Sequence, residues 1–134
     1  MIPVDPDANL VRAMQAGAFG LRHAKVLVLF PEGERTVDGE IKTFKKGAAI
    51  LSQHLRAPIV PVAIRGSFEF WPRARGFQWT RILPGAGRIR IAIGATIPPP
   101  EPLAAGADRR DAEAAYAAAT ERLRSAVEAM WQRL

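Results

Sequence analysis

A short apolar run that ends in a charged turn constrains this chain more than any other feature. Residues 26–30 read Val-Leu-Val-Leu-Phe, and residues 31–36 read Pro-Glu-Gly-Glu-Arg-Thr. A continuous apolar run with β-branched and aromatic members predicts a buried strand. Because proline cannot donate to a ladder, strand pairing should end near Pro31. We therefore expect a central strand at 26–30 that carries a charged turn to the end of a sheet.

The charged turn contains residue types that can bind an anion. Gly33 lets the backbone bend sharply or approach a ligand closely. Arg35 carries a planar fork that fits a phosphate or carboxylate, and Glu32 is placed to hold that fork. The alternative is that Glu32 and Arg35 only pair with each other and close the turn.

This turn resembles the signature of the glycerolipid acyltransferases of the lysophosphatidate (1-acylglycerol-3-phosphate) acyltransferase type. Their signature is Phe-Pro-Glu-Gly-Thr-Arg-Ser, and residues 30–36 are Phe-Pro-Glu-Gly-Glu-Arg-Thr. Glu34 departs from the family's Thr, whereas Thr36 keeps the hydroxyl of the family's Ser. The resemblance continues through Phe-Lys-Lys-Gly-Ala at 44–48 and Ile-Val-Pro-Val-Ala-Ile at 59–64, and it covers roughly residues 2–98.

The resemblance implies a binding site for the phosphate of the acyl acceptor. The two lysines of this site are expected just inside the first turn of the next helix, where free backbone donors also favour an anion. For these lysines a solvated helix face is the alternative. The implied site residues are Glu32, Gly33, Arg35, Thr36, Lys45 and Lys46.

The family's catalytic pair, His-x-x-x-x-Asp, is absent from this chain. In that pair the His is the general base for the acceptor hydroxyl, and the Asp orients the imidazole. Val28 stands five residues after His23, and Ile59 stands five residues after His54. We therefore expect the C-terminal portion of an acyltransferase domain, incomplete at its N-terminus, without catalytic residues and inactive in isolation.

The fold implied is α/β, with a mixed sheet, helices packed against it, and a sheet edge and apolar surface left uncovered. Expected elements are helices from about 7 to 22, 44 to 55 and 109 to 134, a buried strand at 59–64 and a half-exposed strand at 88–93. We assign residues 1–98 to the acyltransferase portion, 99–108 to a proline-rich linker and 109–134 to an amphipathic C-terminal helix.

Composition excludes several classes of site. The absence of cysteine rules out disulfides, thiol catalysis and thiolate metal ligands. Two well-separated histidines argue against a zinc cluster. No apolar run approaches the length of a spanning helix, and Asp5 and Asp7 interrupt any N-terminal signal peptide. We expect no metal and no cofactor, with acyl-CoA or acyl carrier protein as a co-substrate.

Arginines and aromatic rings alternate between residues 65 and 90, where six arginines face one acid, Glu69. Arginine with tryptophan suits anionic lipid headgroups. We therefore expect a peripheral protein of the cytoplasmic face of the inner membrane. A nucleic-acid surface is a weaker alternative, because the surrounding motifs belong to no nucleic-acid module, and a third interpretation packs the rings on the core. The expected membrane contacts are Trp71, Arg73, Arg75 and Trp79.

The activity implied by the resemblance belongs to phospholipid biosynthesis. A fatty acyl group would move from acyl-CoA or acyl carrier protein to the hydroxyl of a lysophospholipid or glycerol phosphate. Residues 66–72, Gly-Ser-Phe-Glu-Phe-Trp-Pro, also look like acyltransferase segments fused to acyl-activating synthetases. The alternative of a different class is a non-catalytic module that binds anionic lipid or phosphate.

Overall fold

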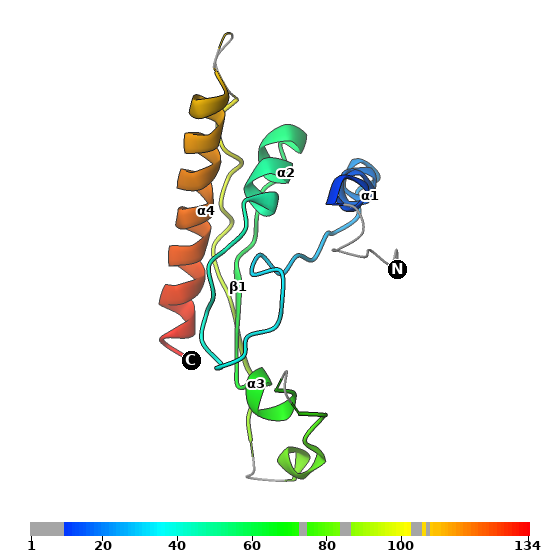
Figure 1. The fold of residues 1–134 in the computed structure, drawn as a ribbon, viewed down its shortest axis with the longest axis vertical. Coiled ribbons are helices and arrows are strands. Elements are labelled where there is room, and N and C mark those ends of the chain that lie inside the picture. Colours follow the sequence, from blue (N-terminus) through cyan, green and yellow to red (C-terminus); the bar gives the residue numbers. More distant parts are fainter. Residues whose placement is uncertain (1–9, 73–74, 84–86, 103–105, 107) are drawn as a thin grey trace.

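A computed structural model describes residues 10–72, 75–83, 87–102, 106 and 108–134. Figure 1 shows α4 running alongside the sheet, with α2 next to both and α1 on the far side of α2. Helices and a small sheet together agree with the predicted α/β class. In chain order the elements are α1 (Leu10–Arg22), α2 (Gly47–Leu55), β1 (Val62–Arg65), α3 (Ser67–Phe70), the 3-10 turn η1 (Trp79–Ile82), β2 (Arg90–Ile93) and α4 (Arg109–Trp131).

The sheet is a pair of antiparallel strands. β1 and β2 pair with Val62 opposite Ile93 and Ile64 opposite Ile91. A bridge between Ile59 and Ile97 prolongs the pairing. The mixed sheet expected from the sequence is therefore corrected to a two-stranded antiparallel sheet over the residues that the structure describes.

The helix α4 covers the face of the sheet that carries small side chains. Ala63 is buried, and a Cβ added at Gly94 would lie 2.8 Å from the sulfur of Met130. Helix and sheet therefore approach closely. At the end of this contact the Arg65 guanidinium lies 4.6 Å from the ring centroid of Trp131.

The opposite face of the sheet carries the larger apolar side chains and is uncovered. Ile91 and Ile93 are 60% and 73% exposed, and their cross-strand partners Ile64 and Val62 are also exposed. The chain exposes 9883 Å², whereas a compact monomer of 14.6 kDa should expose about 6,900 Å². The expected uncovered apolar surface is therefore present, and the strand predicted as buried at 59–64 is half-buried.

The strand predicted at residues 26–30 is not formed. The segment runs as a loop after α1, and Val26, Val28 and Phe30 are 90%, 73% and 73% exposed. Leu27 alone turns inward, against Gly17 of α1. A buried strand needs a neighbouring strand at its edge and cover on both faces. The two-stranded sheet is covered by α4 on one face only, and residues 26–30 pair with neither of its strands, so the prediction of a buried central strand is wrong.

The core lies along α4, where α2 and β1 each pack against this helix. Helix α2 begins at Gly47 with Lys46 at its N-cap, so Lys45 and Lys46 precede the helix rather than lying inside its first turn. The buried apolar residues are Phe44, Ala49, Leu51, Ala63, Tyr116 and Leu123.

The proline-rich segment before α4 is tied to α2. The Pro100 carbonyl accepts a hydrogen bond from Arg56 Nη1 at 2.6 Å, and the Glu101 carbonyl accepts one from Gln53 Nε2 at 2.8 Å. Residues predicted as a linker thus contact the folded part of the chain over the range that the structure describes.

The last helix begins where the sequence predicts. The Asp108 carboxylate accepts hydrogen bonds from the amides of Arg110 and Asp111, at 2.7 and 2.9 Å, and the Asp111 side chain caps the Asp108 amide in return. Asp7, near which the first helix is predicted to begin, lies outside the described residues. Across the described part of the chain, no helix has the length and apolar character needed to cross a membrane.

Candidate phosphate-binding site

Gly33 forms the bend of the charged turn. Its φ of +78° lies in the left-handed region that favours glycine, and its amide donates to the Phe30 carbonyl at 3.0 Å. A Cβ at this position would lie 2.6 Å from Lys45 Nζ. The lysine ammonium therefore lies close to the glycine backbone, in the space that a side chain at this position would occupy.

The turn is also fixed to the segment that precedes α2. The Lys45 amide donates to the Pro31 carbonyl at 2.7 Å, and the Lys42 amide donates to Glu32 Oε2 at 3.1 Å. Within the described residues no ion pair joins Glu32 to Arg35. Glu32 therefore stabilises the loop that follows the turn, and the pairing that would have closed the turn through Arg35 does not form.

Arg35 is held by an aromatic ring from a distant segment. Its guanidinium carbon lies 4.9 Å from the ring centroid of Trp71. Over the described ranges no carboxylate pairs with Arg35 or with Lys45. Lys45, whose side chain lies against Gly33, and Arg35, two residues further along the chain from Gly33, are therefore left with capacity to bind an anion.

Two of the predicted site residues make other contacts. The Thr36 hydroxyl donates to Asp38 Oδ1 at 2.6 Å and accepts from the Gly39 amide at 3.1 Å, and its hydrogen bond lowers the pKa of Asp38. Lys46 pairs with Glu113 of α4, and this hydrogen bond lowers the pKa of that carboxyl. The predicted cluster is thus reduced to Gly33, Arg35 and Lys45, with Glu32 supporting the loop behind them.

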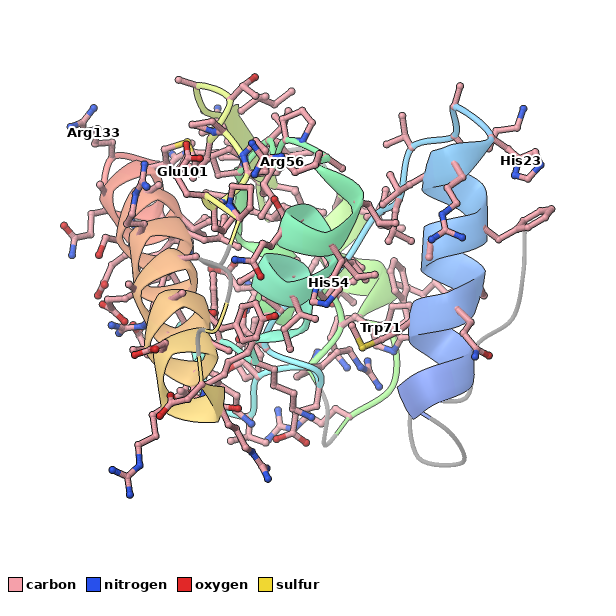
Figure 2. All side chains as sticks on the ribbon, turned by 90° about the horizontal axis from the view of Figure 1, so that it is seen from above. His23, His54, Arg56, Trp71, Glu101 and Arg133 are labelled. Carbon is pink, nitrogen blue, oxygen red and sulfur yellow. The ribbon has the colours of Figure 1, made fainter. Side chains whose placement is uncertain are left out.

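Neither histidine has a carboxylate partner among the described residues. His23 Nδ1 lies 2.8 Å from the Phe19 carbonyl at the end of α1. His54 Nδ1 lies 3.0 Å from the Ile50 carbonyl on α2. Figure 2 shows the two imidazoles on different helices. Across the part of the chain that the structure describes, no group of three or more acidic or histidine side chains is arranged to hold a metal ion.

The aromatic residues after α3 form a chain of edge-to-face contacts on the surface. Ring centroids are 6.3 Å apart for Trp71 and Phe77, and 4.8 Å apart for Phe77 and Trp79. Trp71 is 57% exposed and Trp79 is 74% exposed, so these rings do not pack into the core. Arg75 is exposed, and Arg73 lies outside the described residues.

Comparison with known proteins supports the resemblance seen in the turn. A family profile described as Acyltransferase matches residues 1–65. A 1-acyl-sn-glycerol-3-phosphate acyltransferase of Pseudomonas aeruginosa is 27% identical over 89 residues, which cover 66% of this chain and 32% of that protein. The enzyme of the same name from Limnanthes alba is 42% identical over 45 residues, covering 34% of this chain and 16% of the relative. No solved structure matches.

The profile match and the signature at residues 30–36 show that residues 1–65 are similar to the acyltransferase domain of the glycerolipid acyltransferases. The matching part spans about a third of the length of the bacterial relative and about a sixth of the plant relative.

Proposed function

We propose that this chain provides the acceptor-phosphate site of a glycerolipid acyltransferase. The complete reaction would transfer a fatty acyl group from acyl-CoA or acyl carrier protein to a hydroxyl of a lysophospholipid or glycerol phosphate. The observation that carries the proposal is the Gly33 bend, flanked by Arg35 and Lys45, neither of which is paired with a carboxylate in the described residues.

The chemistry of this turn fits a phosphate monoester. Arg35 can donate two parallel N–H bonds to phosphate oxygens, and Lys45 adds a compact positive charge. The absence of a Cβ at Gly33 lets the Lys45 ammonium lie against the turn, where it can meet an anion. Holding the phosphate fixes the acceptor hydroxyl, so that attack on a nearby thioester becomes a local step.

In that step the acceptor oxygen bonds to the thioester carbonyl carbon, the carbon–sulfur bond breaks, and the sulfur leaves as a thiol after receiving a proton. The base that takes the hydroxyl proton is a His–Asp pair in this family, and neither His23 nor His54 has the required spacing. We propose that an acyl-activating synthetase, fused or adjacent as residues 66–72 imply, supplies the acyl thioester.

Replacing Arg35 by Lys should weaken binding of sn-glycerol 3-phosphate about tenfold. The charge remains but the paired donors are lost, and a hydrogen bond to a charged group contributes about 1.5–3 kcal/mol. Isothermal titration calorimetry on the parent and on Arg35→Lys measures the difference. Arg110→Lys, the same exchange on the exposed surface of α4, should bind as the parent does.

The proposal is contradicted if Arg35→Lys binds sn-glycerol 3-phosphate as the parent does while Arg35→Ala unfolds the chain. In that case Arg35 serves only to stabilise the turn.

A second candidate function is a non-catalytic module for anionic lipid or phosphate. The side chains of both histidines contact backbone carbonyls of their own helices, which favours this candidate over catalysis by either imidazole. Both functions use the same cationic turn, and they differ in whether acyl transfer accompanies binding.

We also propose that the chain attaches peripherally to anionic membrane, at the cytoplasmic face of the inner membrane. The support is the exposed pair Trp71 and Trp79, with Arg75 and Arg81 in the same segment. Aromatic rings at headgroup level contribute binding free energy that salt does not screen. Arginines contribute an electrostatic part of the binding free energy, which salt screens.

Sedimentation with vesicles should show binding that rises with phosphatidylglycerol content and falls only partly in high salt. Trp79→Ala should remove most of the salt-resistant remainder, because Trp79 is the more exposed of the two tryptophans. Leu83→Ala, a change at an exposed apolar residue just beyond η1, is the matched control and should have a smaller effect. Equal binding by Trp79→Ala and the parent would contradict the membrane proposal.

A further inference from the structure

Trp71 makes a contact that its place in the sequence does not suggest. It follows the short helix α3, 36 positions after Arg35, yet its ring lies 4.9 Å from the Arg35 guanidinium. The ring is 57% exposed, so it does not act as a core residue. The arginine of the signature is therefore covered on one side by an aromatic surface.

The segment around Trp71 is fixed to its surroundings at several points. The Trp71 amide donates to the Ser67 carbonyl at 3.0 Å, and the Gln78 amide donates to the Phe70 carbonyl at 2.8 Å. The Phe77 ring packs edge-on against Trp71. These contacts hold the indole in place beside Arg35.

The loop that follows Arg35 also packs on α3. Gly39 has φ +90°, and a Cβ there would lie 3.2 Å from the Phe68 ring. Phe68 and Trp71 both come from the same short stretch of chain. The turn and the aromatic segment therefore touch at two places, and Arg35 lies at one of them.

An aromatic ring beneath a guanidinium restricts the orientation of the guanidinium plane. It leaves the edge of the guanidinium open to a ligand. When a guanidinium stacks with its face on an aromatic ring, its N–H donors point outward in its own plane, where a phosphate can accept two of them. No carboxylate in the described residues competes for these donors. An arginine held in this way loses less freedom when it binds a phosphate.

We infer that Trp71 is a positioning residue for the acceptor phosphate, which acts by holding the Arg35 guanidinium with its edge toward the Gly33 bend. This inference rests on the proposed phosphate site and adds a residue to it. Trp71 need not touch the phosphate.

The test uses the soluble probe sn-glycerol 3-phosphate, so that membrane binding plays no part. Trp71→Ala and Trp71→Leu should bind about two- to fivefold more weakly than the parent, which is the range expected for a cation–π contact at an exposed site. Trp71→Phe should keep most of the affinity. Trp131→Ala, which removes the ring beside Arg65 instead of the ring beside Arg35, should bind as the parent does.

A double-mutant cycle separates positioning from a general structural effect. In an Arg35→Ala background, Trp71→Ala should cause no further loss of affinity. The inference is overturned if the loss persists there, if Trp71→Ala binds as the parent does, or if Trp131→Ala weakens binding equally. If the parent itself binds no sn-glycerol 3-phosphate, the proposed function fails first and the inference fails with it.

Discussion

The isolated chain is expected to show no acyl transfer above the uncatalysed rate when supplied with long-chain acyl-CoA and lysophosphatidate. Proton removal by a positioned base contributes about 10²- to 10⁴-fold to such reactions. Neither histidine here has a carboxylate partner in the described residues, and neither is followed by Asp at the required spacing. Release of the free thiol, followed continuously, measures the rate.

Two variants make this expectation specific. His23→Ala and His54→Ala should leave the background rate unchanged. A 1-acyl-sn-glycerol-3-phosphate acyltransferase that contains the His-x-x-x-x-Asp pair serves as the positive control. Turnover by the parent that either alanine variant abolishes would show that one of these histidines is the base after all.

Replacing Gly66 by Ala should destabilise the chain by about 3 kcal/mol or unfold it. Gly66 has φ +90°, and a Cβ there would overlap the carbonyl oxygen of Arg88, so the new side chain is both strained and obstructed. The clash falls where β1 leads into α3 and next to the segment that enters β2. Relieving it requires the sheet or the start of α3 to move.

Urea denaturation followed by far-UV circular dichroism measures this loss. Gly47→Ala is the matched control, because nothing lies within 4 Å of a Cβ at Gly47 and the residue begins helix α2. The control should be neutral or slightly stabilising, since Ala forms helix better than Gly. Equal midpoints for Gly66→Ala and the parent would show that the chain between β1 and α3 is not packed as described.

The helices could be predicted from the sequence because their signals are local. The apolar stripe of α4 and the cap at Asp108 lie within one short stretch of chain, and the observed helix Arg109–Trp131 starts at the predicted residue. The strands are less well predicted, since apolar residues indicate a tendency to be buried but do not identify what will bury them. Val26, Val28, Leu29 and Phe30 are apolar and exposed for that reason.

In the candidate site, too, the features with local sequence signals could be predicted and the contacts between distant segments could not. Gly33 and Arg35 are close in sequence, and the family resemblance was enough to name them. That Lys45 lies over Gly33 while Lys46 pairs with Glu113 depends on where α2 begins, which no sequence pattern specified to the residue. The contact between Arg35 and Trp71 joins two segments far apart in the chain, and no local signal predicts it.

The central claim is that the Gly33 turn binds the acceptor's phosphate, and a titration followed by ¹H–¹⁵N NMR tests it most directly. Addition of sn-glycerol 3-phosphate to the labelled chain should shift the Gly33 amide and the Arg35 Nε–H signal together, with one dissociation constant. Signals of exposed α4 residues such as Arg110 should stay in place. Saturable shifts elsewhere in the chain, with Gly33 and Arg35 unchanged, would contradict the account.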